Sequence, residues 1–210
     1  MRILILFGVL LIVLPLSLAA FREGPLPNMT GGFGEPNCHQ CHLDNPIDAP
    51  GGRVVIEGVP PAYTPARTYT VTVTLTRAGM ERGGFEIAAR FDEGWNRGKQ
   101  AGTWQVEGPR LQMIASQIDP ALMFVQHTAA GTKTDAPGTI SWTMAWTAPS
   151  YSDAVTFHVA ANASNDDASP LGDYIYLTHA TAVSFQAQAR GYTSSSAVAS
   201  RTAPDAFFIR

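Results

Sequence analysis

Hydrophobic and polar positions alternate with a period of two along much of the chain after residue 53. The clearest alternation covers residues 69–76, 140–146 and 155–161. Because successive side chains of a β-strand point to opposite faces, this pattern is typical of half-buried strands. Weaker strand candidates are residues 53–57, 84–91, 102–106, 110–115, 122–128 and 181–188. Glycine and proline turns separate the candidates, so we predict an all-β fold, an immunoglobulin-like antiparallel β-sandwich.

The first 53 residues follow a different pattern. Residues 3–20 are largely apolar, follow the basic Arg2 and end in small residues, which is typical of a secretory signal peptide and also long enough for a membrane anchor. Residues 21–53 are rich in glycine and proline and cannot form a core of their own. We therefore divide the chain into a signal peptide or anchor (1–20), an arm (21–53), the sandwich (54–190) and a flexible tail (191–210).

Export and charge narrow the classes of partner. A cleaved or anchoring leader places the rest of the chain on the periplasmic or extracellular side, with the N-terminal segment as the only membrane contact if it is uncleaved. The formal net charge is −3, from 14 basic and 17 acidic residues. Nucleic acid is not expected as a partner, because it is bound by basic surfaces.

Both cysteines of the chain lie in the arm, in the string Cys38-His39-Gln40-Cys41-His42. Cys-x-x-Cys-His is the attachment pattern of c-type haem, in which the thiols bind two vinyl groups and the histidine binds the iron. We predict one covalently attached haem c, anchored by Cys38 and Cys41, with His42 as an axial ligand. Asn37 is expected to cap a short helical turn that carries the motif. A short-loop disulfide, a redox dithiol or a zinc site are the alternatives.

The second axial ligand of the iron is an open question. Histidine and methionine are the usual donors. His127, at the end of a predicted strand, is the first candidate, and Met80, at an expected exposed hairpin tip, is the alternative. A purely structural role for the His127 ring is the competing interpretation. The remaining possibilities are a five-coordinate iron and the three residues Met29, Met113 and Met123. Of the other histidines, His39 points away from the iron, His158 faces solvent or a second layer, and His179 lies in a loop.

Three further groups of residues carry weaker signals. Asparagine and aspartate crowd residues 162–173, where a calcium site and ordinary turns both fit. Trp142 and Trp146 belong to an alternating stretch and are expected in the core. Trp95 and Tyr63 are candidates for haem packing or partner contact. No catalytic motif is visible, so we do not expect an enzyme. An enzymatic function would require a haem iron with an open position that reacts with peroxide or another small ligand.

The chain resembles Reeler domains, and more closely the bacterial choice-of-anchor V proteins, over about residues 30–188. The arm matches at Asn37 to His42, and the sandwich matches at Tyr63-Thr64-Pro65, Tyr69-Thr70-Val71-Thr72-Val73, Gly84-Phe85-Glu86-Ile87, Gln126-His127-Thr128, Trp146-Thr147-Ala148-Pro149, Val155-Thr156-Phe157 and Ala160-Ala161-Asn162-Ala163. The resemblance implies a Reeler-like sandwich on an exported haem protein. Reeler domains without haem carry a similar dipeptide at His127, which is why a structural role is considered there.

The chain departs from this family at two places. Ala66 stands where the family usually has glycine. Because alanine disfavours the left-handed backbone conformation, the family's turn is not expected to be kept at this position. The C-terminal string Ala206-Phe207-Phe208-Ile209-Arg210 is not the family's sorting anchor, so surface anchoring is not inferred.

These features together predict an exported monohaem c-type cytochrome that transfers electrons. We expect a carrier or a subunit of a larger redox complex. The expected partners are redox proteins, including those of a multi-subunit membrane complex. The alternative is a cell-surface or extracellular interaction module whose haem is ancillary.

Overall fold

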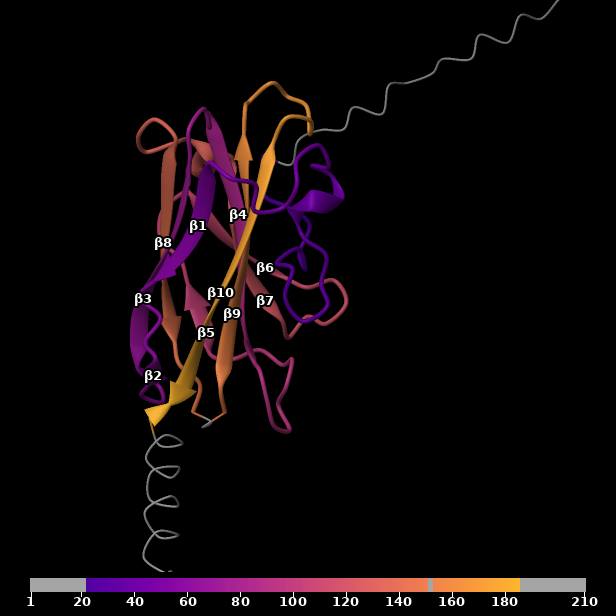
Figure 1. The fold of residues 1–210 in the computed structure, drawn as a ribbon. Coiled ribbons are helices and arrows are strands. Elements are labelled where there is room, and N and C mark those ends of the chain that lie inside the picture. Colours follow the sequence, from indigo (N-terminus) through magenta and orange to yellow (C-terminus); the bar gives the residue numbers. More distant parts are fainter. Residues whose placement is uncertain (1–21, 151–152, 186–210) are drawn as a thin grey trace, which may run out of the picture.

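Two β-sheets pack face to face in the computed structural model, which describes residues 22–150 and 153–185 (Figure 1). The four-stranded sheet has the order β1-β3-β8-β5 and consists of β1 (Gly52–Glu57), β3 (Thr68–Arg77), β8 (Thr139–Thr147) and β5 (Thr103–Gln105). The six-stranded sheet has the order β2-β10-β9-β4-β7-β6 and consists of β2 (Ala62–Tyr63), β10 (Tyr174–Ser184), β9 (Val155–Ser164), β4 (Arg82–Phe91), β7 (Met123–His127) and β6 (Leu111–Ala115). Only the short β2–β10 pairing is parallel among these strands, so the predicted antiparallel β-sandwich is confirmed.

The core lies between the two sheets and follows the predicted alternation. On β9 the side chains of Val155, Phe157 and Val159 are fully buried against the opposite sheet. Trp142 and Trp146 enter the same core from β8, as expected, and their indole nitrogens donate to backbone oxygens of Gly131 and Ala101. Burial of rings this large, with their polar atoms satisfied, is the main source of stability in a sandwich core.

Strand β10 begins earlier than the sequence pattern indicated. Residues 181–188 were expected as a strand and His179 in a loop, whereas β10 starts at Tyr174 and includes His179. The first half of β10 is apolar on both faces, because Tyr176 faces the core and Ile175 and Leu177 lie beneath the arm. A strand covered on both faces loses its period-two pattern, so alternation alone did not reveal it.

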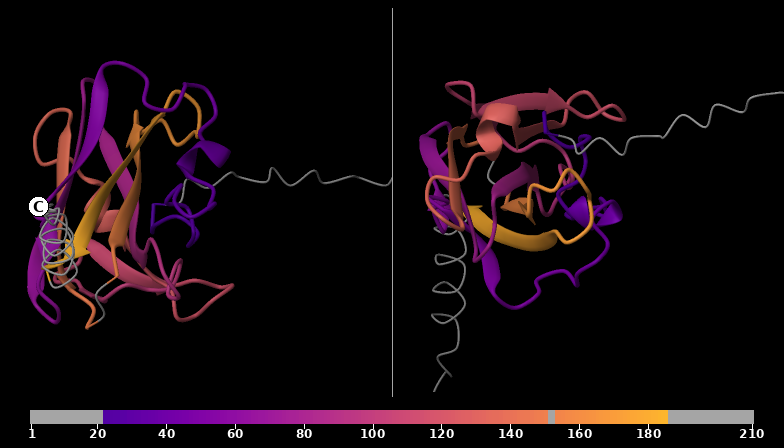
Figure 2. Two further views of the ribbon diagram at one scale, coloured as in Figure 1. Left: turned by 60° about the horizontal axis from the view of Figure 1, so that its bottom comes forward. Right: turned by 90° about the horizontal axis from the view of Figure 1, so that it is seen from above.

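The arm covers the outer face of the six-stranded sheet (Figure 2). Its backbone is tied to that sheet by hydrogen bonds, from Met29 N to Glu86 Oε1 at 2.7 Å and from Asp48 N to Ile175 O at 2.9 Å. At Gly32 the arm passes so close to His158 that an added Cβ would lie 2.2 Å from the imidazole ring. The arm therefore has no separate core, as predicted, and is packed as a third layer over the sheet.

Two expectations about single residues are corrected by the fold. Tyr63, a candidate for partner contact, is fully buried, and its hydroxyl donates to Asp153 O at 2.7 Å. Ala66 adopts a left-handed backbone conformation with φ of 59°, so the turn keeps its shape without glycine.

The leader and the tail, predicted at residues 1–20 and 191–210, lie outside the described residues. Among residues 22–150 and 153–185, no helix combines the length and the apolar character needed to cross a bilayer.

Candidate functional site

The two cysteines and His42 lie on one short helical turn that rests against the six-stranded sheet. The turn η1 (Cys38–Gln40) is a 3₁₀ helix, and the side chain of Asn37 caps it by accepting from His39 N at 2.8 Å. The amide nitrogens of Cys41 and His42 both donate to Cys38 O, at 3.3 and 3.2 Å. The cap predicted from the sequence is confirmed, and the turn carries both thiols and the imidazole of His42.

The two thiols have different environments. Cys38 is buried against Ala160 and Ile175 of the sheet, whereas Cys41 is exposed. Burial, with a further contribution from the nearby Glu86 carboxylate, raises the pKa of the Cys38 thiol to about 12. The two sulfur atoms are not joined in a disulfide. A free Cys38 would therefore stay protonated and unreactive at neutral pH.

His42 is held by a buried carboxylate. Its Nδ1 lies 2.8 Å from Asp173 Oδ2, and Asp173 is only 1% exposed. The amide nitrogen of Asn162 donates to the same carboxylate oxygen at 3.0 Å and lies 3.4 Å from both ring nitrogens of His42. An Nδ1–H that donates to Asp173 places the lone pair of the neutral ring on Nε2.

Hydrogen bonds, rather than burial, determine the charge of Asp173. Desolvation alone would raise the pKa of Asp173, but donors from His42, Asn162 and the Asn165 backbone outweigh it, and the pKa lies below the ordinary value. The carboxylate is therefore ionised at neutral pH and able to orient the imidazole of His42.

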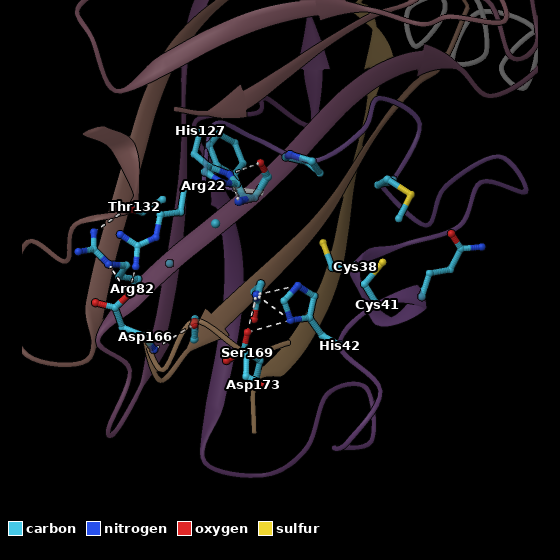
Figure 3. A pocket seen from close by; sticks show the side chains of 18 of the residues that line it. Arg22, Cys38, Cys41, His42, Arg82, His127, Thr132, Asp166, Ser169 and Asp173 are labelled. Carbon is cyan, nitrogen blue, oxygen red and sulfur yellow. Dashed lines mark hydrogen bonds and ion pairs between the residues drawn. The ribbon is translucent and has the colours of Figure 1, made fainter. Parts of the chain in front are cut away.

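The turn forms one wall of a pocket of about 170 Å³ at the end of the sandwich (Figure 3). The residues that line it come from the arm, from β4, from the end of β7 and from the loop between β9 and β10. They include Cys38, Cys41, His42, His127, Arg22 and Arg82. Most of the remaining wall is apolar and includes Leu26, Met29 and Phe85.

His127, the first candidate for the second axial ligand, lines the same pocket as the cysteine turn. Its Nδ1 accepts a hydrogen bond from Phe85 N at 2.9 Å and lies 3.2 Å from Phe85 O, so the backbone of β4 positions the ring. Gly84 leaves room for it, because an added Cβ there would lie 2.7 Å from the Cε1 atom of His127. His127 and His42 thus contribute imidazoles from different walls of one cavity.

Met80 is not at this pocket. It was expected at an exposed hairpin tip, but it is 4% exposed and packs in the core between the sheets. Among the other methionines, Met29 lines the pocket, whereas Met113 and Met123 are not among its lining residues. Trp95 is 92% exposed and likewise lies outside the pocket.

The remaining histidines also have defined places. His39 contacts Asn45 O at 3.0 Å and points away from the pocket, as predicted. His158 and His179 face each other across β9 and β10, and His158 lies beneath Phe33 of the arm. The outer face of the sheet at His158 is therefore covered by the arm.

Sequence reasoning missed the role of two residues in the segment 162–173. Asn162 in β9 and Asp173 directly before β10 were considered as turn residues or calcium ligands, and they instead contact His42. Within residues 22–150 and 153–185, no group of three or more histidine, cysteine, aspartate or glutamate side chains is arranged to hold a metal ion. The signal that could have singled out Asp173 is its place directly before an apolar strand, where a buried carboxylate needs a partner.

A layer of buried charge lies between the arm and the sheet beside the pocket. Arg90 and Glu35 form an ion pair in which both side chains are less than one-tenth exposed. Glu86 is fully buried, and desolvation raises its pKa to about 8 even though Met29 N donates to it. Among the described residues, the second oxygen of Glu86 makes no hydrogen bond, and neither does Oε1 of Gln126, its partner in strand register.

Comparisons with known proteins reach only the level of the fold. No protein-family model and no curated protein matches the sequence. The Reelin-N domain of F-spondin is similar at 18% identity and a TM-score of 0.44, covering 70% of this chain and 96% of that domain. The human F-spondin reeler domain is similar at 18% identity and a TM-score of 0.40, covering 64% and 88%. A cohesin module from a Clostridium perfringens family 33 glycoside hydrolase is similar at 11% identity and a TM-score of 0.43, covering 63% and 95%.

Proposed function

We propose that this protein is an exported monohaem c-type cytochrome that transfers electrons, as a carrier or as a subunit of a larger redox complex. The observation that carries the proposal is the seating of Cys38, Cys41 and His42 on one turn at a pocket, with His42 oriented by the buried Asp173. A metal-bound histidine commonly donates its second ring N–H to a carboxylate, which fixes the ring and strengthens it as a ligand.

The residues at the pocket fit a haem in chemical type. Cys38 and Cys41 would hold the vinyl edge as thioethers, and His42 would supply Nε2 to the iron. When bound, the haem supplies a one-electron iron couple. The apolar wall formed by Leu26, Met29 and Phe85 would exclude water from part of the site. Exclusion of water is one of the means by which a protein adjusts the potential of such a couple.

His127 is the proposed second axial ligand. It lines the pocket that the turn lines, and Phe85 O lies within reach of its Nδ1. In this structure Phe85 N–H donates to Nδ1 at 2.9 Å, which places the proton of the neutral ring on Nε2. Ligation through Nε2 would require the other tautomer, in which Nδ1–H donates to Phe85 O, the oxygen 3.2 Å away. Ligation by two histidines would give a lower potential than ligation by histidine and methionine.

The surroundings of the pocket are suited to a protein partner. Leu26, Leu43 and Leu171 are each more than half exposed, and they lie in the arm and in the loop before β10 that border the site. Exposed apolar side chains near a site are a feature of docking surfaces. We propose a redox protein as the partner and a choice-of-anchor V type of architecture, with the N-terminal segment as the only membrane contact.

The direct test is production of the full chain together with a c-type haem maturation system. We expect the mass of one haem to be added covalently to the polypeptide and a visible spectrum that changes reversibly on reduction. The Cys38→Ala and Cys41→Ala variants should each lose one thioether, and the double variant should lose the covalent mass. A wild-type protein that is matured without any added haem mass would refute the proposal.

The second axial ligand is tested by spectra of the oxidised and reduced protein. His127→Ala should convert a low-spin spectrum to a high-spin one, whereas His179→Ala, which alters an exposed histidine of β10, should leave it unchanged. Met80→Ala should also leave the ligand bands in place, because Met80 lies in the core. Unchanged bands in His127→Ala would exclude this histidine as the ligand.

The alternative functions make different predictions in the same experiments. An interaction module with ancillary haem would keep its partner binding after Cys38→Ala. A haem enzyme would show a five-coordinate iron that reacts with peroxide.

A further inference from the structure

The end of the pocket opposite the cysteines is a candidate binding site for carboxylate groups. Figure 3 shows Cys38 and Cys41 on one side of the cavity and Arg22, Arg82 and Asp166 gathered on the other. Both arginines bind the same oxygen, Asp166 Oδ1, with Nη2 of Arg22 at 2.8 Å and Nε of Arg82 at 2.7 Å. Two cations on one carboxylate leave a surplus positive charge at this end.

The arginines are partly fixed in place before any ligand arrives. Nη1 of Arg82 donates to the Thr132 hydroxyl at 3.0 Å, and its Nε contacts Asp166. The Arg82 side chain is 34% exposed and that of Arg22 is 49% exposed, so both retain donors that can reach into the cavity. An arginine held by part of its guanidinium group is well suited to bind a second carboxylate with the rest.

The chemistry of the porphyrin matches this layout. A haem carries its two vinyl groups on neighbouring pyrroles at one edge and its two propionates at the opposite edge. If Cys38 and Cys41 hold the vinyl edge, the propionates point toward the far side of the cavity, where the arginines lie.

We propose that Arg22 and Arg82 bind the propionate groups of the haem and thereby fix its orientation in the pocket. This inference rests on the proposed function, since it needs a porphyrin in this cavity. Asp166 is then a competitor that neutralises part of the arginine charge while the site is empty. Arg22 and Arg82 act as positioning residues, because they contact the periphery of the cofactor and not the iron.

The test compares two porphyrins that differ only in the carboxylates. Full-length apoprotein is titrated by fluorescence with zinc protoporphyrin IX and with its dimethyl ester, so that no covalent attachment is required. We expect the wild type to bind the free acid about tenfold more tightly than the diester, as the loss of charge-assisted hydrogen bonds implies. In the double variant Arg22→Gln, Arg82→Gln this preference should fall to about one.

Three matched variants separate the role of charge from damage to the fold. Arg110→Gln removes an arginine of similar exposure that pairs with Asp135 outside the pocket, and it should leave the preference unchanged. Arg82→Lys retains a positive charge and should retain part of the preference. Asp166→Asn should increase it, because the competing carboxylate is gone. The solubilities of the two porphyrins cancel when their ratio is compared between variants.

The outcomes separate this inference from the proposal it rests on. Equal binding of acid and diester by the wild type would overturn the propionate site and leave the haem proposal standing. Failure of both porphyrins to bind the wild type would overturn both. A preference that persists in the double variant, with thermal unfolding unchanged, would assign the carboxylates to other residues and also overturn the inference.

Discussion

Glu86 is a carboxylic acid that the arm seals away from water, and its protonation is linked to stability. The free side chain titrates near 4.5, and burial raises its pKa in the folded protein to about 8. Between these values the folded state binds a proton that the unfolded state has released. The free energy of unfolding therefore falls as pH rises through this window.

Replacement of Glu86 by glutamine should remove that pH dependence. Glutamine keeps an oxygen for Met29 N–H and carries no charge, so we expect Glu86→Gln to be more stable than wild type at pH 9 by roughly 1–3 kcal/mol. The difference should shrink toward pH 5, where Glu86 is protonated in the folded protein. Urea unfolding at several pH values measures this, with Glu81→Gln, at an exposed position directly before β4, as the control. A difference that does not vary with pH would contradict the assigned titration.

A second prediction at the scale of single residues concerns backbone strain at Ala66, where the first concerned a buried charge. Its φ of 59° is costly for any residue with a Cβ. Ala66→Gly should therefore stabilise the sandwich by about 1 kcal/mol, measured by thermal or denaturant unfolding. Ala136→Gly, also at an exposed turn but without a positive φ, should be destabilising. If both substitutions lowered stability, the positive φ of Ala66 would not be a source of strain in the folded protein.

At the scale of elements, the arm and β10 depend on each other. The Ile175 and Leu177 side chains of β10 form the surface on which Cys38 rests. The arm in turn covers the outer face of that strand. The sequence predicted the arm and the second half of β10, but it revealed neither the first half of β10, which lacks alternation, nor the packing of the arm against it. The strands whose outer face meets solvent, such as β3 and β8, were predicted closely.

At Gly32 the arm lies too close to the sheet for a side chain. A Cβ at Gly32 would collide with the His158 ring, so Gly32→Ala should lift the arm without disturbing the core between the sheets. We expect faster proteolysis and amide exchange within residues 22–51, with little change at β3 and β8. The second substitution His158→Ala makes room for the methyl group and should restore protection. If the double variant is cleaved and exchanged as fast as Gly32→Ala, the collision with His158 is not what loosens the arm.

At the scale of the whole molecule, the arm and the sandwich should unfold as one unit. Unfolding of the two layers can be followed separately with buried side chains. Cys38 reports on the arm, and Trp142 and Trp146 report on the core. In apoprotein at neutral pH, Cys41 should react with a thiol reagent at once, whereas Cys38 should react only as denaturant unfolds the tryptophan core. Labelling of Cys38 well below the fluorescence transition would instead mean that the arm detaches by itself.

The limits of sequence reasoning are also clearest at this scale. The cysteine motif, its cap and the sandwich are local patterns, and each was predictable from a few neighbouring residues. Contact of Asp173 and Asn162 with His42 depends on the docking of the arm onto the end of β9 and the start of β10, more than a hundred residues later in the chain. Burial of Met80 likewise depends on the way the β3–β4 turn folds over the core. No short-range pattern encodes such contacts, so the motif was predictable and its supporting residues were not.

The direction in which β10 runs has a practical consequence. The strand begins at Tyr174, next to the pocket, and runs the length of the sandwich before it ends at Ser184 near the opposite end (Figure 1). A tether joined after Ser184 would hold the molecule on an electrode with its cavity turned toward the solution. If the cavity holds a haem, as proposed, such a film would favour electron exchange with a soluble partner over direct exchange with the electrode, and a tether placed at the arm would reverse that preference.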